Sequence, residues 1–250
     1  MLILLPPSET KHPGGVRRPL DLDTLAFPGL RPQREAVVDA LVALSADENA
    51  AARVLKLSER QRPEIGANAR LREAPTMPAV DRYTGVLFDA LDASSLDAAS
   101  RRWLGGHVLI HSAPFGPVGA LDRIPAYRLA ANTALPGVPP LTRHWAGAVT
   151  TALDSASPSF VLDLRSEAYA ALGPVPAGVP TRYVRGVTDG PDGSSRALNH
   201  FNKHAKGAFV RALAQARPRA TTEGGLRRWA DGAGFVLREG SAPGELDLVV

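Results

Sequence analysis

The segment Met1–Lys11, MLILLPPSETK, decides the fold. Its four consecutive apolar residues, Leu2–Leu5, predict a short buried strand. The two prolines that follow end this strand at once, because proline lacks the ladder N–H and fixes φ. The polar residues from Ser8 to Lys11 therefore leave the carboxyl end of a strand, which is where α/β proteins usually build their sites. Lys11 adds a flexible cation there.

The composition is that of a soluble globular protein. The chain has 250 residues, of which 44% are hydrophobic and 22% are charged. No apolar run approaches the roughly 18 residues that a membrane span needs, and no basic segment precedes the first apolar run. We therefore expect a cytoplasmic protein without a membrane partner. The absence of cysteine excludes disulfides, thiolate metal sites and cysteine nucleophiles.

The charge balance indicates an anionic partner. The formal net charge is +4 and the sequence pI is about 9.7, which fits DNA or a phosphate-bearing small molecule. A solvated, arginine-rich surface is the alternative. The chain has 25 arginines but only four lysines, and Lys11, Lys203 and Lys206 all lie in polar motifs. Lysine is the compact, tunable cation, so these positions are candidates for a required amine.

Apolar runs and amphipathic segments alternate along the chain. This alternation predicts one α/β domain over residues 1–250, with a mixed central sheet flanked by helices. We expect its antiparallel part to come from the C-terminal strands, and the glycine pair at 105–106 to end a helix. The predicted strands are 2–5, 107–111, 160–164, 183–187, 234–238 and 245–250, and the predicted helices are 32–45, 47–57, 96–104, 139–153 and 199–214.

Two segments are predicted to lack regular structure. The stretch after the strand 107–111 contains FGPVG, in which two glycines and a proline favour a loop. The segment DGPDGSS, residues 189–195, is typical of a hairpin tip.

The segment NHFNKHAKG, residues 199–207, is predicted to lie on a helix. Asn199, Lys203 and Lys206 then share one face, because residues three and four apart are neighbours on a helix. Two cations within one turn are unfavourable unless an anion or a carboxylate lies opposite them, which favours an anion-binding face. A solvent-exposed basic helix is the alternative.

The sequence does not predict a metal or cofactor site. His200 and His204 have the i, i+4 spacing of a metal pair, but no glutamate completes an H-E-x-x-H motif. No nucleophile elbow, Walker A loop or dinucleotide fingerprint occurs in the chain.

Two further segments carry candidate ligand-binding residues. In DRIPAYR, the residues Asp122, Tyr127 and Arg128 combine groups suited to a polar or anionic ligand, although a structural Asp–Arg pair explains them equally. Ser166 and Glu167 follow the predicted strand 160–164. Ser166 is placed to cap the next helix, and Glu167 could carry a proton.

These motifs together resemble the YaaA family over essentially the whole chain. The resemblance rests on the order and spacing of several segments rather than on one diagnostic motif. The matching segments are MLILLPPSETK at 1–11, RYTG at 82–85, the stretch from 110 through DRIPAYRL at 122–129, HW at 144–145, LDLRSEAY at 162–169, NHFNKHAKG at 199–207 and GEL at 244–246.

The resemblance implies a cytoplasmic protein that protects against hydrogen peroxide by limiting free iron and oxidative DNA damage. It also implies DNA binding through a helix-hairpin-helix-like element beside a basic cleft in an α/β body. The positions that match the family pattern are Ser8, Lys11, Tyr83, Thr84, Gly85, Tyr127, Arg128, Ser166, Tyr169, Lys203, Lys206 and Gly207. One departure is that Gly119 and Ala120 stand where relatives commonly have Arg-Pro, so a cation is missing near that segment.

Two functions remain open from the sequence. The first is binding of DNA or another phosphate-bearing ligand in a basic cleft, as part of the peroxide response. The second is an enzyme that acts on a nucleobase, a nucleotide or a similar small molecule in a pocket around Lys11, Arg128, Lys203 and Lys206. An open basic groove would favour DNA, whereas a deep pocket around Lys11 would favour the enzyme.

Overall fold

The computed structural model describes residues 1–16, 18–189, 195–196 and 199–249. The strands are β1 (Leu2–Leu5), β2 (Met77–Pro78), β3 (Val108–Ser112), β4 (Gly116–Gly119), β5 (Arg123–Ile124), β6 (Val161–Asp163), β7 (Thr181–Asp189), β8 (Ser195–Arg196), β9 (Val236–Glu239) and β10 (Glu245–Val249). The helices are α1 (Arg31–Leu44), α2 (Glu48–Val54), α3 (Ile65–Ala69), α4 (Ala79–Arg82), α5 (Val86–Leu91), α6 (Ala98–His107), α7 (Leu141–Ala156), α8 (Glu167–Ala170), α9 (Asn199–Ala216) and α10 (Glu223–Gly232).

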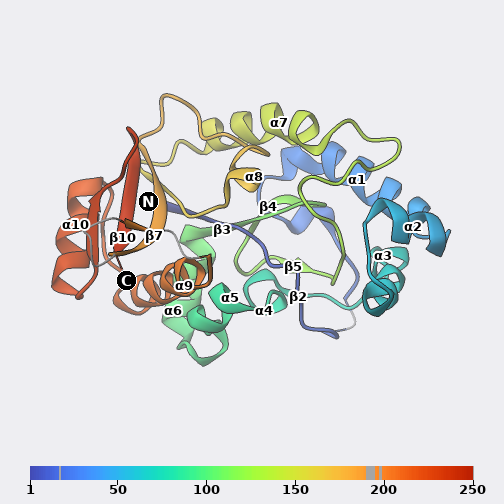
Figure 1. Ribbon diagram of the computed structural model, residues 1–250, viewed down its shortest axis with the longest axis horizontal. Helices are drawn as coiled ribbons and strands as arrows, with labels where there is room; N and C mark the ends of the chain where they lie inside the picture. The colour runs from blue at the N-terminus through green and yellow to red at the C-terminus, as the bar shows by residue number, and fades with distance from the viewer. Residues whose placement is uncertain (17, 190–194, 197–198, 250) are drawn as a thin grey trace.

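The main sheet is mixed, as the sequence predicts, and its order is β4-β3-β1-β6-β7-β10-β9. Strands β3, β1, β6, β7 and β10 run parallel to one another, while β4 and β9 are antiparallel to their neighbours at the two edges. Helices α1, α7 and α8 cover one face of the sheet, and α5, α6 and α9 lie along the other (Figure 1). The predicted mixed α/β fold is confirmed.

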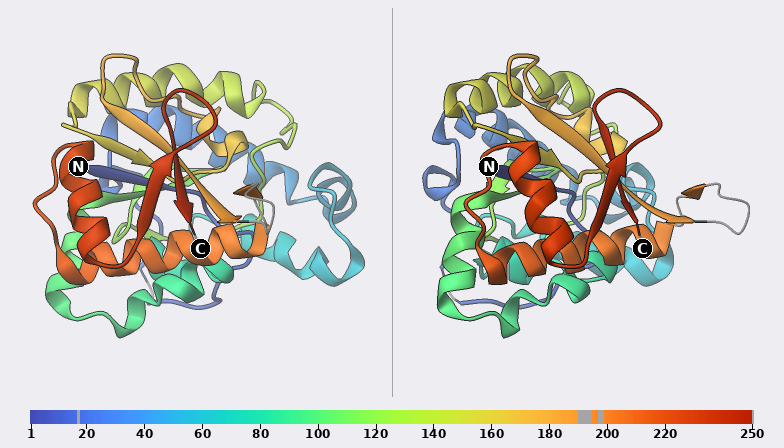
Figure 2. Two further views of the ribbon diagram at one scale, coloured as in Figure 1. Left: turned by 60° about the vertical axis from the view of Figure 1, so that its left-hand side comes forward. Right: turned by 90° about the vertical axis from the view of Figure 1, so that its left-hand side faces the viewer.

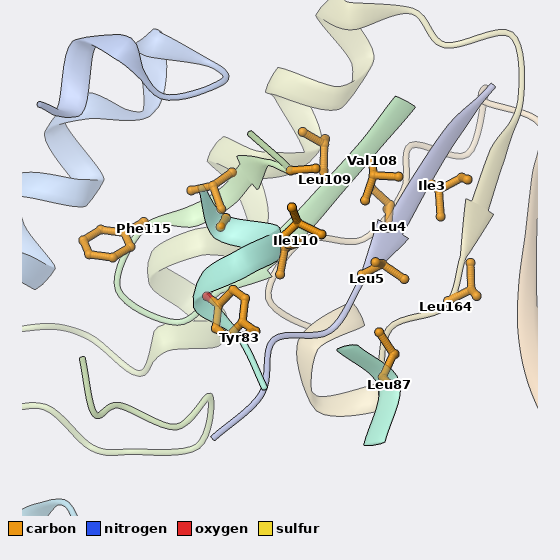
Figure 3. Packing of buried hydrophobic residues seen from close by; sticks show 14 of the residues in the cluster. Ile3, Leu4, Leu5, Tyr83, Leu87, Val108, Leu109, Ile110, Phe115 and Leu164 are labelled. Carbon is orange, nitrogen blue, oxygen red and sulfur yellow. The ribbon is translucent and has the colours of Figure 1, made fainter. Parts of the chain in front are cut away.

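Strand β1 lies at the centre of the apolar core. It pairs in parallel with β3 on one side, Ile3 opposite Val108, and with β6 on the other, Ile3 opposite Leu162. Figure 3 shows the leucine and isoleucine side chains of β1 packed among those of β3 and beside Leu87 of α5. A continuous apolar strand is typical of a parallel sheet whose two faces are both covered.

The antiparallel strands are not confined to the C-terminal part of the chain. The expected pair is present, since β9 and β10 are antiparallel, but β4 adds an antiparallel edge beside β3. The expectation of an irregular FGPVG segment is therefore wrong. Gly116–Gly119 pairs with β3, and Pro117 is tolerated because an edge strand need not donate a ladder hydrogen bond at every position.

The glycine pair at 105–106 also behaves differently from the prediction. Helix α6 continues through both glycines to His107 and leads directly into β3. Gly105 instead allows the Leu121 side chain to pack closely against α6, because a Cβ at position 105 would lie 2.8 Å from Cδ1 of Leu121.

Two predicted features are not confirmed by the described residues. Strand β7 pairs antiparallel with β8, which lies at the far end of β7 (Figure 2). The predicted hairpin tip between them includes residues 190–194, which lie outside the described residues. The helix-hairpin-helix-like element stays a prediction.

The strand order creates a topological switch point between β1 and β6. From β1 the chain crosses to β3 on one side, and it later returns to place β6 on the other side of β1. The connections at the carboxyl ends of β1 and β6 therefore diverge and leave a crevice, which is the usual ligand position in open α/β sheets.

Helix α9 is held closely against this crevice by two contacts. Gly207 faces α5 so tightly that a Cβ there would lie 2.1 Å from the carbonyl oxygen of Leu87. On the other side, Oδ1 of Asn202 accepts a 3.0 Å hydrogen bond from the backbone N–H of Gly186 in β7. Together these contacts fix the lysines of α9 relative to the sheet.

We expect Gly207→Ala to destabilise the protein by about 1–3 kcal/mol, because the added methyl group must push α9 away from α5. The measurement is the free energy of unfolding from urea denaturation. Gly232→Ala is the matched control, since nothing lies within 4 Å of its Cβ position, and alanine in a helix gains about 0.5–1 kcal/mol over glycine. Equal stability of the two variants would contradict the close contact.

Candidate ligand-binding site

Two adjoining pockets lie at the carboxyl ends of β1 and β6. The first has a volume of about 440 Å³ and is lined by Pro6, Pro7, Ser8, Glu9, Thr10, Thr84, Gly85, Val86, Leu87, Phe88, Ser166, Tyr169 and Lys203. The second has a volume of about 370 Å³ and is lined by Pro6, Leu87, Leu164, Ser166, Glu167, Ala168, Tyr183, Arg185, Asn202, Lys203 and Lys206. They share Pro6, Leu87, Ser166 and Lys203, and we call the two together the switch-point groove.

Lys206 is the buried cation of the groove. Its side chain projects from α9, and Nζ donates a 3.0 Å hydrogen bond to the carbonyl oxygen of Leu164 just after β6. Nζ also lies 5.7 Å from the centre of the Tyr183 ring. Burial lowers the pKa of Lys206 to about 8; Asp163 acts in the opposite direction and Arg185 adds to the lowering.

Lys203 and Arg185 carry the accessible positive charge of the groove. Lys203 lies one helical turn before Lys206 and is exposed, so its ammonium remains solvated. Arg185 projects from β7 and makes an ion pair of 3.6 Å with Glu245. Exposed carboxylates of Glu9 and Glu167 lie in the same groove, so it presents both signs of charge.

Lys11 lies beside the groove and does not line it. Its Nζ donates hydrogen bonds to the carbonyl oxygens of Ser8, at 2.9 Å, and Glu9, at 3.1 Å. It also lies 4.1 Å from the centre of the Tyr127 ring, a cation–π distance. Burial, with a contribution from Arg128, lowers the pKa of Lys11 to about 7, although Glu64 and Glu9 oppose the shift. Lys11 therefore shapes the loop that borders the groove.

Tyr83 and Tyr127 form a buried polar pair beneath Lys11. Their hydroxyl oxygens are 2.8 Å apart, and both side chains are almost fully buried. Burial raises the pKa of both phenols, which therefore stay protonated at neutral pH. Their rings meet edge to face. The pair supplies the rigid aromatic wall against which the Lys11 ammonium lies.

Arg128 is held in place from two sides. The buried Asn68 side chain donates to the Arg128 carbonyl at 2.9 Å and accepts from the Arg128 N–H at 2.7 Å. The guanidinium pairs with Glu9 at 3.1 Å and Glu64 at 3.6 Å. Through Glu9, Arg128 is connected to the first pocket, although it does not line it.

The other predicted site residues divide between the groove and the scaffold. Ser8, Thr84, Ser166 and Glu167 line the groove. Asp122 lies elsewhere, where its carboxylate accepts from the N–H groups of Ala26 and Gly119 and ties two loops together. This is the structural alternative that the sequence left open, although the carboxylate partners are backbone groups rather than an arginine. Asn199 begins α9, and its side chain lies outside the described residues.

Several residues that support the groove were not predicted from the sequence. Arg165 is buried and pairs through Nη2 with Asp163 at 2.7 Å, while its Nη1 donates to His111 Nδ1 at 2.9 Å. This ion pair fixes the turn between β6 and Ser166. The segment LDLRSEAY contains Arg165, but no sequence signal marked Tyr183, Arg185 or Asn68, since their roles depend on strands and helices far apart in the chain.

The family model for the peroxide stress protein YaaA matches residues 1–240 of this chain. The chain belongs to the YaaA family. A UPF0246 protein of Corynebacterium efficiens is 48% identical over 241 residues, which cover 95% of this chain and 94% of the relative. A UPF0246 protein of Streptomyces coelicolor is 45% identical over 219 residues, covering 85% of this chain and 82% of the relative. The resemblance read from the sequence is thereby confirmed.

No described helix is both long and apolar enough to cross a membrane. Within the same described part of the chain, no three histidine or acidic side chains come together as metal ligands would.

The lowered pKa of Lys11 predicts a pH dependence of stability. Between pH 7 and 10.5 the amine is largely neutral in the folded protein but protonated in the unfolded chain. Because the unfolded state binds more protons in this range, stability rises with pH. Lys11 contributes at most about 1.4 kcal/mol per pH unit to this rise, and we expect Lys11→Met to lose that contribution.

Urea denaturation between about pH 7.5 and 9.5 measures this effect. The exposed Lys56 provides the control variant Lys56→Met, which should keep the native pH dependence. If Lys11→Met kept it as well, the Lys11 amine would not be the group that titrates.

Proposed function

We propose that this YaaA-family protein acts in the hydrogen peroxide response by binding a phosphate-bearing small molecule in the switch-point groove. We further propose that this binding helps to limit iron-dependent oxidative damage, as the family resemblance implies. The observation that carries the ligand proposal is the convergence of Lys203, Lys206 and Arg185 at the carboxyl ends of β1 and β6.

The dimensions of the groove support a compact ligand. Its two pockets, of about 370 and 440 Å³, are in the range of small-molecule sites. They are lined by apolar side chains together with a few polar ones, an arrangement that fixes the orientation of a ligand. A phosphate accepts hydrogen bonds from arginine and lysine. Ser166 at the shared wall offers a hydroxyl donor to the same group.

The charge distribution favours a small molecule over a duplex. The carboxylates of Glu9 and Glu167 stand in the groove beside the cations. An extended DNA backbone would pass both carboxylates, whereas a single phosphate can contact Lys203 and Arg185 alone. The carboxylates then remain available for the neutral or hydrogen-donating part of the ligand, such as a sugar hydroxyl or the amino edge of a base.

Removal of the Lys203 charge should weaken phosphate binding. We expect Lys203→Gln to raise the dissociation constant for adenosine monophosphate roughly tenfold, the effect of losing one charge-assisted hydrogen bond. Isothermal titration calorimetry measures this constant, with inorganic phosphate as competitor. Lys56→Gln removes an identical charge from an exposed position outside the groove and is the matched control.

The same pair of variants links binding to the cellular function. Cells that carry Lys203→Gln at matched expression should survive peroxide challenge less well, and hold more free iron, than cells with Lys56→Gln. Equal affinity of both variants for phosphate-bearing ligands would refute the groove as the phosphate site.

DNA is the second candidate partner, supported by the net charge of +4 and the exposed Lys203. If a duplex backbone occupies the groove, log affinity should fall linearly with log salt concentration, because each neutralised phosphate releases counterions. Lys203→Gln should then reduce this slope by about 1, equally for unrelated sequences. Fluorescence anisotropy at several salt concentrations measures it. A slope unchanged by Lys203→Gln would argue against DNA in the groove.

A further inference from the structure

The groove contains an amine, Lys206, whose surroundings suit a nucleophile better than a member of an ion pair. Lys206 is only 6% exposed, yet it lines the second pocket. Its one hydrogen bond within the described part of the chain goes to the Leu164 carbonyl. The carboxylate of Asp163, which acts electrostatically on Lys206, is engaged by two hydrogen bonds from the Arg165 side chain. A permanently charged Lys206 would therefore be a buried cation without an ion-pair partner, which is costly.

We propose that Lys206 is an imine-forming residue, whose Nζ condenses with the aldehyde or ketone carbonyl of a phosphate-bearing small molecule in the switch-point groove. This proposal rests on the phosphate-binding function proposed above. The substrates would be phosphorylated carbonyl compounds, and the two lysines of α9 would have different roles. Lys203 and Arg185 hold the phosphate, while Lys206 reacts.

The geometry supplies what an amine nucleophile needs. The Leu164 carbonyl accepts one N–H of Lys206, which orients Nζ and leaves the nitrogen lone pair free in the neutral amine. Desolvation and a neighbouring cation are the two usual ways to activate a lysine, and burial and Arg185 provide both here. Gly207 and Asn202 hold the helix closely against α5 and β7, so the amine is fixed relative to the groove.

The chemical step balances without an added oxidant or reductant. The Nζ lone pair attacks the carbonyl carbon, and one proton passes from nitrogen to the former carbonyl oxygen, which gives a carbinolamine. The second proton of the amine then passes to this hydroxyl group, which leaves as water, and a C=N bond remains. Glu167 lines the same pocket and is exposed, so its carboxyl group can carry the proton between nitrogen and oxygen.

The other lysines are less suited to this role. Lys11 donates to two carbonyl groups and lies outside the groove. Lys203 is exposed and solvated, and Lys56 is an exposed residue just after α2. The chain has only four lysines, so peptide mapping can distinguish a label at Lys206 from one at each other lysine or at the N-terminal amine.

The test is trapping of the imine on the full-length protein. Pyridoxal 5′-phosphate, a phosphate-bearing aldehyde, is added, the imine is reduced with borohydride, and the labelled peptides are mapped by mass spectrometry. We expect Lys206 to be labelled at least tenfold faster than Lys56, and inorganic phosphate to slow the reaction at Lys206. Labelling should increase as the pH rises through about 8, where the Lys206 amine loses its proton.

Two variants and a second probe separate the possible outcomes. Lys206→Arg should lose the label, and Lys56→Arg should retain it. The imine proposal is overturned if Lys206 is labelled no more than Lys56, or if Lys203 carries most of the label. Mapping of the native chain gives this result even if Lys206→Arg fails to fold. If phosphate-bearing ligands bind but Lys206 is not labelled, the imine alone fails. If unphosphorylated pyridoxal labels Lys206 equally well and phosphate does not compete, the phosphate site fails while the reactive amine stands.

Discussion

The parallel pairing of β1 with both β3 and β6 is the constraint on which the rest of the structure depends. Ile3 and Leu4 pair with both neighbouring strands, and Ile3, Leu4 and Leu5 are buried. The chain can therefore leave this strand only at its end, and Pro6 forces it out of the sheet. Because the connections of β1 and β6 diverge at that end, a groove forms between them.

The groove is surrounded by polar groups that the scaffold holds in defined positions. Asn68 fixes the backbone of Arg128, and Arg128 in turn holds Glu9. On the other side, Arg165 and Asp163 fix the turn that carries Ser166. Preorganised side chains of this kind reduce the entropy cost of binding. These contacts hold the residues at both sides of the groove in defined positions.

Lys11, beside the groove, and Lys206, which lines it, have different surroundings. Near β1, Lys11 directs its N–H groups to backbone carbonyls and lies over an aromatic ring, so it stabilises the loop Ser8–Glu9 from inside. Near β7, Lys206 faces the pocket itself. Burial lowers the pKa of both lysines, but their hydrogen-bond partners and their access to the groove differ.

The sequence by itself determined the fold class, the family and most helices and strands, because apolar runs and their periodicity reflect burial directly. It also placed Ser8, Ser166, Lys203 and Lys206 at element ends or on one helical face. It missed β4, because edge pairing can override the local preferences of glycine and proline. Only the tertiary structure decided that Lys11 lies beside the groove and that Asp122 joins two loops. It also decided that Tyr183 and Arg185 line the groove. These roles depend on contacts between segments more than 90 residues apart or on neighbouring strands, which no local pattern records.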